Sequence, residues 1–264
     1  MASSIAQSTR IDGYLLLELN TALHTKARRR NGNTVVKIVL VRHGQTYANE
    51  AHALDTSRPG LPLTADGLAQ ATDLASRWES EVGQAPTVVA VSPLFRTRQT
   101  CAPLCAKYAL TPLVRPGIRE LRSGDVEMNA DPFSDSVYVE GTGNWSHGAT
   151  HIRMSGAETG EDALARALPV IAEVAGLVLE EDADGVGVIV AHGALLRLLA
   201  STLAHNISGT LVMTHFMSNT GTVILQWPTE RFGTSVPHNP DDLRGAFTGL
   251  TWNNRPVDQW DLED

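Results

Sequence analysis

Two apolar, β-branched runs of this sequence each end in a histidine that is followed by a glycine. Residues 35–41 lead into Arg42 and His43, and residues 187–191 lead into His192. A guanidinium offers a rigid fork of donors to phosphate or carboxylate oxygens, and a neutral imidazole is a nucleophile near pH 7. The glycine after His43 leaves room for a substrate to approach. Ligands bind at the carboxyl ends of parallel strands, although Arg42 and His43 taken alone could equally well cap a strand.

A further cation is predicted at the start of a helix. Residues 92–100 read S-P-L-F-R-T-R-Q-T. Ser92 is predicted as the N-cap and Pro93 as the first helical residue. This places Arg96 in the first turn, where the positive helix end and the free N–H groups attract anions. Arg98 falls elsewhere on the helix and is predicted to be a surface residue.

Together these residues match the needs of phosphoryl transfer, which requires cationic donors, an in-line nucleophile and an acid for the leaving oxygen. Arg42, Arg96 and His192 can serve as donors and His43 as the nucleophile. The best candidate for the acid is Glu120, which follows the third predicted strand. A solvated glutamate in a charged turn is the alternative for this residue.

Strand and helix patterns alternate along the chain from residue 35 onward. Five short runs are predicted as strands: 35–41, 87–92, 113–115, 187–191 and 222–227. Four segments have helical patterns: 65–82, 95–108, 161–181 and 194–203. Alternation of this kind predicts an α/β fold, a three-layer α/β/α sandwich around a mainly parallel sheet, with a long irregular cap segment.

The expected organisation is one domain with an extension. Residues 1–34 carry five basic and two acidic side chains, and we expect a flexible or lightly docked extension; an organelle-targeting peptide is the alternative. Residues 35–264 form the predicted domain. It includes the irregular cap segment 122–160, rich in Gly, Ser, Asp and Asn, and a tail at 228–264 that wraps the domain.

Five side chains of the cap segment could line a pocket mouth, or could equally well decorate a surface loop: Arg122, Trp145, His147, His151 and Arg153. At the end of this segment, Thr159 and Asp162 have the spacing of a capping box. Glu158, just before it, is interpreted as orienting the start of the helix at 161–181.

Composition excludes several classes of function. The formal net charge of −8 argues against nucleic acid or an anionic membrane as the main partner. No run reaches the ~18 apolar residues that span a bilayer, and no secretory signal is recognised, so a cytoplasmic location is the default expectation. Cys101 and Cys105 share one face of a predicted helix, but two thiols cannot complete a structural zinc site, and no metal is expected.

The motifs taken together resemble the histidine phosphatase superfamily, also called phosphoglycerate mutase-like. The resemblance covers about residues 35–227 and rests on five ordered matches: R-H-G-Q-T at 42–46 with Asn49, P-L-T-A-D-G-L-A-Q-A at 62–71, the segment 92–100, V-A-H-G at 190–193, and Asn219. After Glu120 the chain departs from the family pattern, with Ser123, Val126 and Met128 where an aromatic residue, a tryptophan and a glycine are usual.

The resemblance implies a role for each site residue. His43 would accept the phosphoryl group as a phosphohistidine, and Glu120 would be the proton donor. Four side chains would hold the phosphate: Arg42, Asn49, Arg96 and His192. The implied enzyme is a cofactor-independent phosphomonoester hydrolase that acts on a small phosphorylated metabolite.

Two alternatives remain open at this stage. A phosphoglycerate mutase-type phosphotransferase would return the phosphoryl group to a second hydroxyl of the substrate. An inactive relative would bind phospho-ligands or protein partners, but such relatives typically lose the nucleophile or an arginine, and all of these residues are present here. The sequence does not select one substrate or an oligomeric state.

Overall fold

The computed structural model describes residues 35–182 and 184–260, so the expectations for residues 1–34 lie outside the described residues. Six strands form one sheet in the order β3-β2-β4-β1-β5-β6. Their bounds are β1 Lys37–Arg42, β2 Val88–Val91, β3 Leu113–Val114, β4 Val186–Ala191, β5 Thr222–Gln226 and β6 Thr248–Gly249. Strands β3, β2, β4 and β1 are parallel, β5 is antiparallel to β1, and β6 is antiparallel to β5. The predicted mainly parallel sheet is confirmed.

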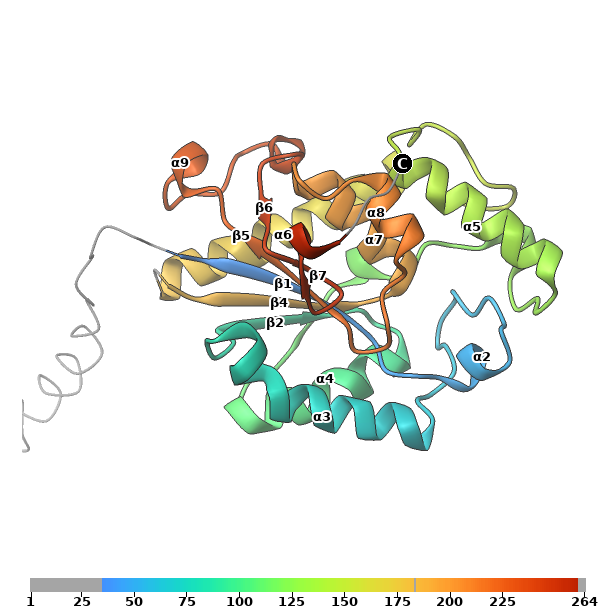
Figure 1. Ribbon diagram of the computed structural model, residues 1–264, viewed down its shortest axis with the longest axis horizontal. Helices are drawn as coiled ribbons and strands as arrows, with labels where there is room; N and C mark the ends of the chain where they lie inside the picture. Colours follow the sequence, from blue (N-terminus) through green and yellow to red (C-terminus); the bar gives the residue numbers. More distant parts are fainter. Residues whose placement is uncertain (1–34, 183, 261–264) are drawn as a thin grey trace, which may run out of the picture. The chain divides into compact units, whose positions relative to one another are not determined.

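Helices cover both faces of this sheet (Figure 1). One face carries α3 (Ala65–Val82) and α4 (Phe95–Tyr108), and the other carries α6 (Gly160–Glu181) and α7 (Gly193–Leu203). Successive strand residues point to opposite faces, so Val39 packs with the α3 and α4 side chains while Ile38 and Leu40 pack with those of α6 and α7. The three-layer α/β/α sandwich is therefore confirmed. The four inner residues of β1 are buried, and its two end residues are partly exposed.

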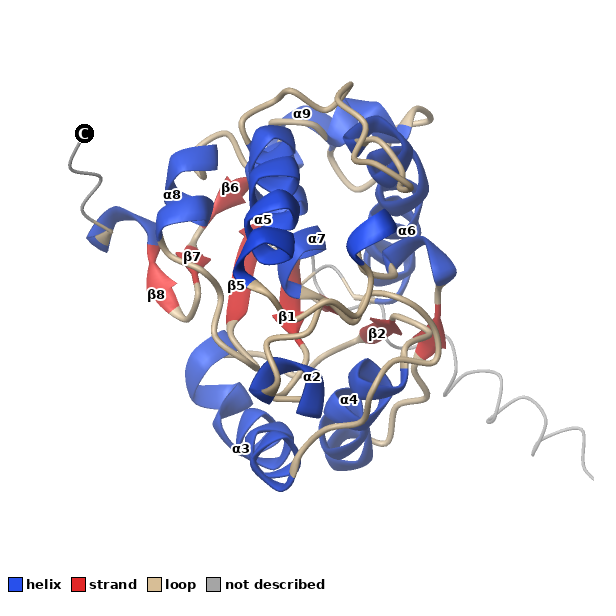
Figure 2. Ribbon diagram, turned by 90° about the vertical axis from the view of Figure 1, so that its right-hand side faces the viewer, coloured by secondary structure: helices blue, strands red, loops and turns tan. Residues whose placement is uncertain are grey.

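The register of the sheet brings the two histidines together. Arg42 at the end of β1 lies opposite Ala191 at the end of β4, and the His43 N–H donates to the Ala191 carbonyl at 3.1 Å. The next residue on each strand is therefore a histidine. Figure 2 looks onto these strand ends, with α5 and α2 on opposite sides of the end of β1.

The helix starts agree only in part with the sequence predictions. Thr159 caps α6, and its side chain and that of Asp162 form the predicted capping box. Helix α4 instead begins at Phe95, and its N-cap is Leu94, which makes no side-chain cap. Ser92 is not the cap because it directly follows the last residue of β2, two residues before the N-cap, and its hydroxyl contacts the ring of His192. Arg96 nevertheless lies in the first turn, as predicted.

The cap segment is not irregular throughout, which corrects the prediction. Helix α5 spans Pro132–Ser146 and is capped by Asp131, whose side chain accepts from the Ser134 N–H at 3.0 Å. Its two internal glycines weaken the helical signal but allow close packing. A Cβ at Gly143 would lie 2.9 Å from Cε of Met213.

The remaining elements are short. They are the helices α2 Tyr47–Glu50, α8 Gly209–Thr214 and α9 Thr229–Phe232, the 3₁₀ turns Pro116–Ile118, Gly124–Val126, Pro240–Leu243 and Val257–Gln259, and the paired strands β7 Thr251–Trp252 and β8 Arg255–Pro256. In the tail, β6 extends the sheet at β5, and Phe247 and Trp252 are fully buried in the α6–α7 side of the core. Among the helices of residues 35–182 and 184–260, none is long and apolar enough to cross a membrane.

Candidate active site

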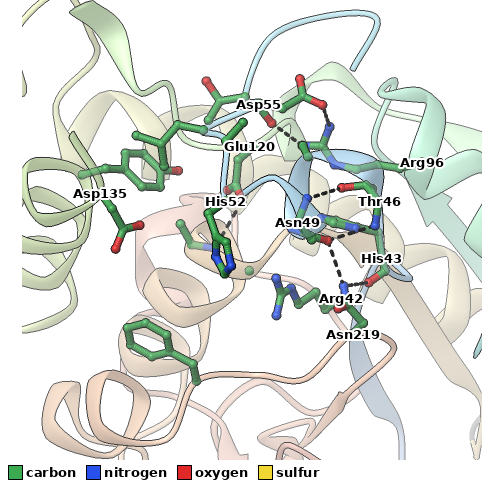
Figure 3. A pocket seen from close by; sticks show the side chains of 18 of the residues that line it. Arg42, His43, Thr46, Asn49, His52, Asp55, Arg96, Glu120, Asp135 and Asn219 are labelled. Atoms are coloured by element: carbon green, nitrogen blue, oxygen red, sulfur yellow. Dashed lines mark hydrogen bonds and ion pairs between the residues drawn. The ribbon is translucent and has the colours of Figure 1, made fainter. Parts of the chain in front are cut away.

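A cavity of about 410 Å³ opens at the carboxyl ends of β1 and β4 (Figure 3). Five of the six predicted site residues line it: Arg42, His43, Asn49, Arg96 and Glu120. The sixth, His192, is fully buried and lies directly behind the lining, with its ring centroid 5.4 Å from that of His43. The structure thus brings together all six residues selected from the sequence.

The ring of His43 is held in one tautomer. Its Nδ1 lies 2.7 Å from the carbonyl oxygen of Gly44, and because a carbonyl only accepts, Nδ1 carries the proton. The lone pair is then on Nε2, for which no hydrogen-bond partner is found among the described residues. Burial lowers the pKa of His43 well below its usual value, and the charges of Arg96 and Arg42 lower it further. His43 is therefore a neutral imidazole near pH 7.

The reason for the glycine after His43 differs from the one expected. A Cβ at Gly44 would lie 2.6 Å from the carbonyl oxygen of Gly67 at the start of α3. The glycine is needed because two backbone segments approach each other there, rather than to admit a substrate. This contact sets the direction in which the chain leaves β1.

Arg96 is anchored by the loop that follows α2. Its Nη2 donates to the backbone oxygen of Asp55 at 2.9 Å, and its Nη1 lies 3.3 Å from Oδ2 of the same residue. Both side chains are more than nine-tenths buried. Burial lowers the pKa of Arg96, and Asp55 opposes that effect. Asp55 was not selected from the sequence, because no local pattern links it to a residue 41 positions away.

Arg42 also lines the cavity, but its charge has fewer partners within the protein than that of Arg96. One Nη atom donates to the Met217 carbonyl, while the buried Nε has no partner among the described residues. Burial, together with the smaller effect of the positive charge of Arg197, lowers the pKa of Arg42 to about 10. A buried guanidinium with an unpaired N–H is suited to an incoming anion.

His192 is fixed by the strand next to it. Its Nε2 lies 2.7 Å from Oγ of Ser92, and its buried Nδ1 has no partner among the described residues. Burial lowers the pKa of His192 well below its usual value, with Arg96 and His43 adding to the effect. The Ser92 hydroxyl, predicted as a helix cap, therefore orients this ring instead.

The carboxylate of Glu120 lies at the start of α7. Its Oε1 accepts from the N–H of Leu195 at 2.9 Å and from that of Leu121 at 2.9 Å, and Oε2 accepts from the N–H of Ala194 at 3.3 Å. The side chain is 7% exposed and lines the cavity. Glu120 is thus a buried, positioned carboxyl group, which settles the choice against a solvated turn residue.

Asn49 lies at the cavity edge, and the oxygen of its side-chain amide is hydrogen-bonded within the protein. Its Oδ1 accepts from the N–H of Thr46 at 3.1 Å and from Nδ2 of Asn219 at 3.3 Å. Asn219 also donates to the carbonyl of His43 at 3.1 Å. The oxygen is therefore used within the protein, which leaves the Nδ2 donor of Asn49 for the cavity.

The far wall of the cavity was not anticipated. It is formed by residues of α5, α7 and the loop after α8: Asp135, Tyr138, Val139, Arg197 and Phe216. The sequence held one usable signal for Arg197, which is the single charged residue in the apolar helix A-L-L-R-L-L-A at 194–200. A charged side chain on such a helix is rarely buried without a functional or structural partner.

The five cap-segment side chains proposed for the pocket mouth do not line this cavity. Trp145 is 1% exposed and donates to the Ile152 carbonyl at 2.7 Å. Arg153 is exposed and paired with Asp162 at 3.1 Å. Glu158, interpreted as orienting the start of α6, pairs with Arg166 of that helix at 2.8 Å and with Arg119, next to Glu120, at 2.9 Å.

The chain belongs to the histidine phosphatase superfamily (branch 1), whose family model matches residues 38–239. The fold and the paired strand-end histidines described above agree with this membership.

Two curated relatives cover different shares of the chain. The PE-PGRS family protein PE_PGRS11 of Mycobacterium tuberculosis is 31% identical over 239 residues, which is 86% of this chain and 38% of that protein. A probable phosphoglycerate mutase, GpmB of Yersinia pestis, is 34% identical over 93 residues, 35% of this chain and 41% of that protein. The matches thus span about two fifths of the length of these relatives.

Solved structures confirm the fold. A mycobacterial glucosyl-3-phosphoglycerate phosphatase in complex with VO3 superposes with a TM-score of 0.57 at 25% identity, over 72% of this chain and 92% of that one. The native form of this phosphatase gives 0.64 at 24% identity, over 83% and 99%. A putative alpha-ribazole-5'-P phosphatase from Escherichia coli gives 0.54 at 21%, over 73% and 90%.

Proposed function

We propose that this protein is a phosphomonoester hydrolase that acts on a small phosphorylated metabolite through a phosphohistidine at His43. The observation that carries the proposal is the state of His43: a neutral ring whose Nδ1 proton is held by Gly44 and whose Nε2 is free at a cavity lined by three arginines. Such a ring can attack phosphorus without first losing a proton.

Four side chains would hold the phosphoryl oxygens. Arg42 and Arg96 supply charge, and each has a buried Nε without a partner among the described residues. His192 would donate from Nδ1, which is also buried and without a partner among the described residues, if Ser92 donates to its Nε2. Asn49 would donate its free Nδ2 at the edge. Charged donors of this kind stabilise a transition state whose charge spreads over the equatorial oxygens.

Glu120 would protonate the departing alkoxide. As the phosphorus–oxygen bond to the leaving group breaks, the Glu120 proton moves to that oxygen and the phosphoryl group remains on Nε2 of His43. Water then attacks the phosphohistidine, Glu120 takes its proton, and inorganic phosphate leaves.

The experiment that tests this proposal uses His43→Ala and p-nitrophenyl phosphate. Because the covalent route requires the ring, we expect both hydrolysis and phosphoenzyme labelling to be lost. His238→Ala, at an exposed residue outside the cavity, is the matched control and should retain both. Undiminished turnover by His43→Ala would exclude the mechanism.

A phosphoglycerate mutase is the second candidate, because one relative carries that name. It would return the phosphoryl group from His43 to a second hydroxyl of the substrate. Incubation with 3-phosphoglycerate and a trace of bisphosphoglycerate separates the two reactions. The hydrolase releases free phosphate, whereas the mutase forms the isomeric phosphoglycerate.

A further inference from the structure

A turn at residues 218–221 holds the backbone carbonyl of His43. This oxygen accepts from the backbone N–H of Thr220 at 3.3 Å and from Nδ2 of Asn219 at 3.1 Å, and Figure 3 shows the second contact. The turn is closed by the Gly221 N–H, which donates to the Ser218 carbonyl at 3.0 Å. The backbone position of the proposed nucleophile therefore depends on the conformation of this turn.

Thr220 gives this turn a strained backbone. Its φ is 55°, which lies in the left-handed region that a β-branched residue rarely adopts. At the third position of a turn, a positive φ favours glycine or asparagine. The residue is also buried. Because backbone strain persists only where the surrounding contacts impose it, the contacts that impose it on Thr220 also fix the carbonyl of His43.

Arg77 of α3 holds the other side of the strained residue. Its Nη2 donates to the Thr220 carbonyl at 2.6 Å, whereas the Thr220 N–H is bound to His43. The rest of the guanidinium is bound on its own helix, with Nη1 2.7 Å from Oδ2 of Asp73 and Nε 2.8 Å from Oε2 of Glu81. A planar fork that is bound at three points has a fixed direction, so Arg77 holds the Thr220 carbonyl in one place.

Arg77 does not line the cavity, so any effect that it has on the reaction must pass through other residues. Two hydrogen bonds connect it to the nucleophile: one from its guanidinium to the Thr220 carbonyl, and one from the Thr220 N–H to the His43 carbonyl. Helix α3 also contacts this segment directly, where Gly67 approaches Gly44. The same helix therefore fixes the chain at His43 through Arg77 and the chain at Gly44 through its first turn.

We propose, resting on the phosphohistidine function proposed above, that Arg77 is a positioning residue for the nucleophile. By holding the Thr220 carbonyl, it keeps the turn in the strained form that directs the Thr220 N–H and the Asn219 amide at the His43 carbonyl. Without Arg77, Thr220 relaxes to a negative φ, which turns its N–H away from His43. The ring of His43 then loses the alignment that in-line attack requires.

The test measures the rate of His43 phosphorylation by p-nitrophenyl phosphate in rapid-quench experiments, together with the substrate concentration that half-saturates this step. Arg77→Met keeps an apolar stem but removes the whole guanidinium. We expect the saturated rate to fall by about 10- to 100-fold, since a misplacement of about 1 Å can cost ~10²-fold. The half-saturating concentration should change by less than about threefold, because the contacts of Arg42 and Arg96 remain.

A double variant separates positioning from a general structural role. Glycine adopts a positive φ without steric cost, so with Thr220→Gly the turn no longer needs Arg77. Arg77→Met combined with Thr220→Gly should therefore phosphorylate His43 within about threefold of the rate of Thr220→Gly alone. An arginine that only fastened α3 to the sheet would show no such recovery. Asp73→Asn removes an exposed partner of Arg77 and leaves the contact with Thr220; it is the matched control and should keep the wild-type rate.

Arg77→Lys provides the test if Arg77→Met does not fold, which thermal unfolding will show. A lysine keeps the charge without the planar fork, so the rate should again fall and Thr220→Gly should again restore it. A wild-type rate in the folded Arg77 variant, or a loss that Thr220→Gly does not restore, overturns the positioning role alone while wild-type His43 is still labelled. Absence of both phosphate release and labelling of His43 in the wild-type protein overturns the proposed function as well.

Discussion

Glu158 and Arg166 form a two-point ion pair directly beneath the segment that carries Glu120. Nε of Arg166 lies 2.9 Å from Oε2 of Glu158, and Nη2 lies 2.8 Å from Oε1. The same guanidinium donates to the carbonyls of Gly117 at 2.6 Å, Arg119 at 2.8 Å and Glu120 at 3.3 Å. Burial opposes ionisation of Glu158, but its hydrogen bonds and the charges of Arg166 and Arg119 outweigh this and lower its pKa. The pair thereby fixes the backbone from which the Glu120 side chain reaches α7.

The first prediction concerns Glu158→Gln. Because the variant removes one partner of a largely buried pair, it should lower the free energy of unfolding by about 1–3 kcal/mol, measured by urea unfolding. Displacement of Glu120 should also lower kcat by at least tenfold, since a shift of about 1 Å can cost ~10²-fold in rate. KM should change much less, because the phosphate contacts remain.

A double variant shows whether Glu158 acts through Glu120. If it does, adding Glu158→Gln to Glu120→Gln should lower kcat little further, because the positioned group is already lost. If the loss of kcat in the double variant equalled the product of the two single losses, Glu158 would not act through Glu120. Glu158→Asp, which keeps the charge, should recover part of the activity.

The second prediction concerns Glu120→Gln, which removes the proposed acid and keeps the size of the side chain. We expect kcat/KM on an alkyl phosphate, which reports the step that breaks the bond to the leaving group, to fall by about 10²- to 10⁴-fold. The loss in kcat/KM should be smaller on p-nitrophenyl phosphate, because p-nitrophenolate leaves without needing a proton. Equal losses in kcat/KM on both substrates would show that Glu120 does not protonate the leaving group.

The sheet and the strand-end residues could be predicted because their signals are local. Each buried parallel strand is a short β-branched run, and β4 and α4 begin or end within two residues of the predicted bounds. The site residues at these strand ends follow from the parallel order of the strands. Arg42, His43 and His192 were therefore found without knowledge of any tertiary contact.

Helix α5 and the far cavity wall could not be predicted, because tertiary packing defines them. Glycines at 141 and 143 interrupt the 3.6-residue pattern of α5, and they are tolerated where Met154 and Met213 pack against the helix. The Tyr138 hydroxyl reaches the Leu121 carbonyl at 2.9 Å, a contact that no local spacing predicts. Asp55 is likewise defined only by its approach to Arg96.

The third prediction concerns Arg96→Lys. A lysine keeps the charge but has a single ammonium in place of the fork that contacts Asp55 at two points and faces the cavity. We expect kcat/KM for p-nitrophenyl phosphate to fall by about 10- to 100-fold, the contribution of one charged phosphate contact. Arg98→Lys, at the exposed arginine two residues away, is the matched control. A loss of less than threefold in Arg96→Lys would remove Arg96 from the phosphate site.

The fourth prediction follows from the two buried histidines. The pKa values of His43 and His192 are lowered well below the usual 6.5 in the folded protein, whereas in the unfolded chain they are close to 6.5. Above pH 6.5 neither state binds these protons, so stability does not depend on them. Below pH 6.5 the unfolded state binds protons that the folded state does not, and the free energy of unfolding should therefore decrease as the pH falls.

The slope of the free energy of unfolding against pH shows whether these two histidines cause the decrease. Each histidine contributes up to about 1.4 kcal/mol per pH unit, so the pair contributes up to about 2.7. Between pH 6.5 and 5 the carboxylates with lowered pKa, among them Glu127 and Glu158, remain largely ionised in both states and add little. Urea unfolding at half-unit pH intervals should give a shallower slope for His192→Gln, which keeps a side-chain donor and cannot titrate. An unchanged slope in this variant would mean that His192 is protonated in the folded protein, and would remove it as a neutral donor at the phosphate.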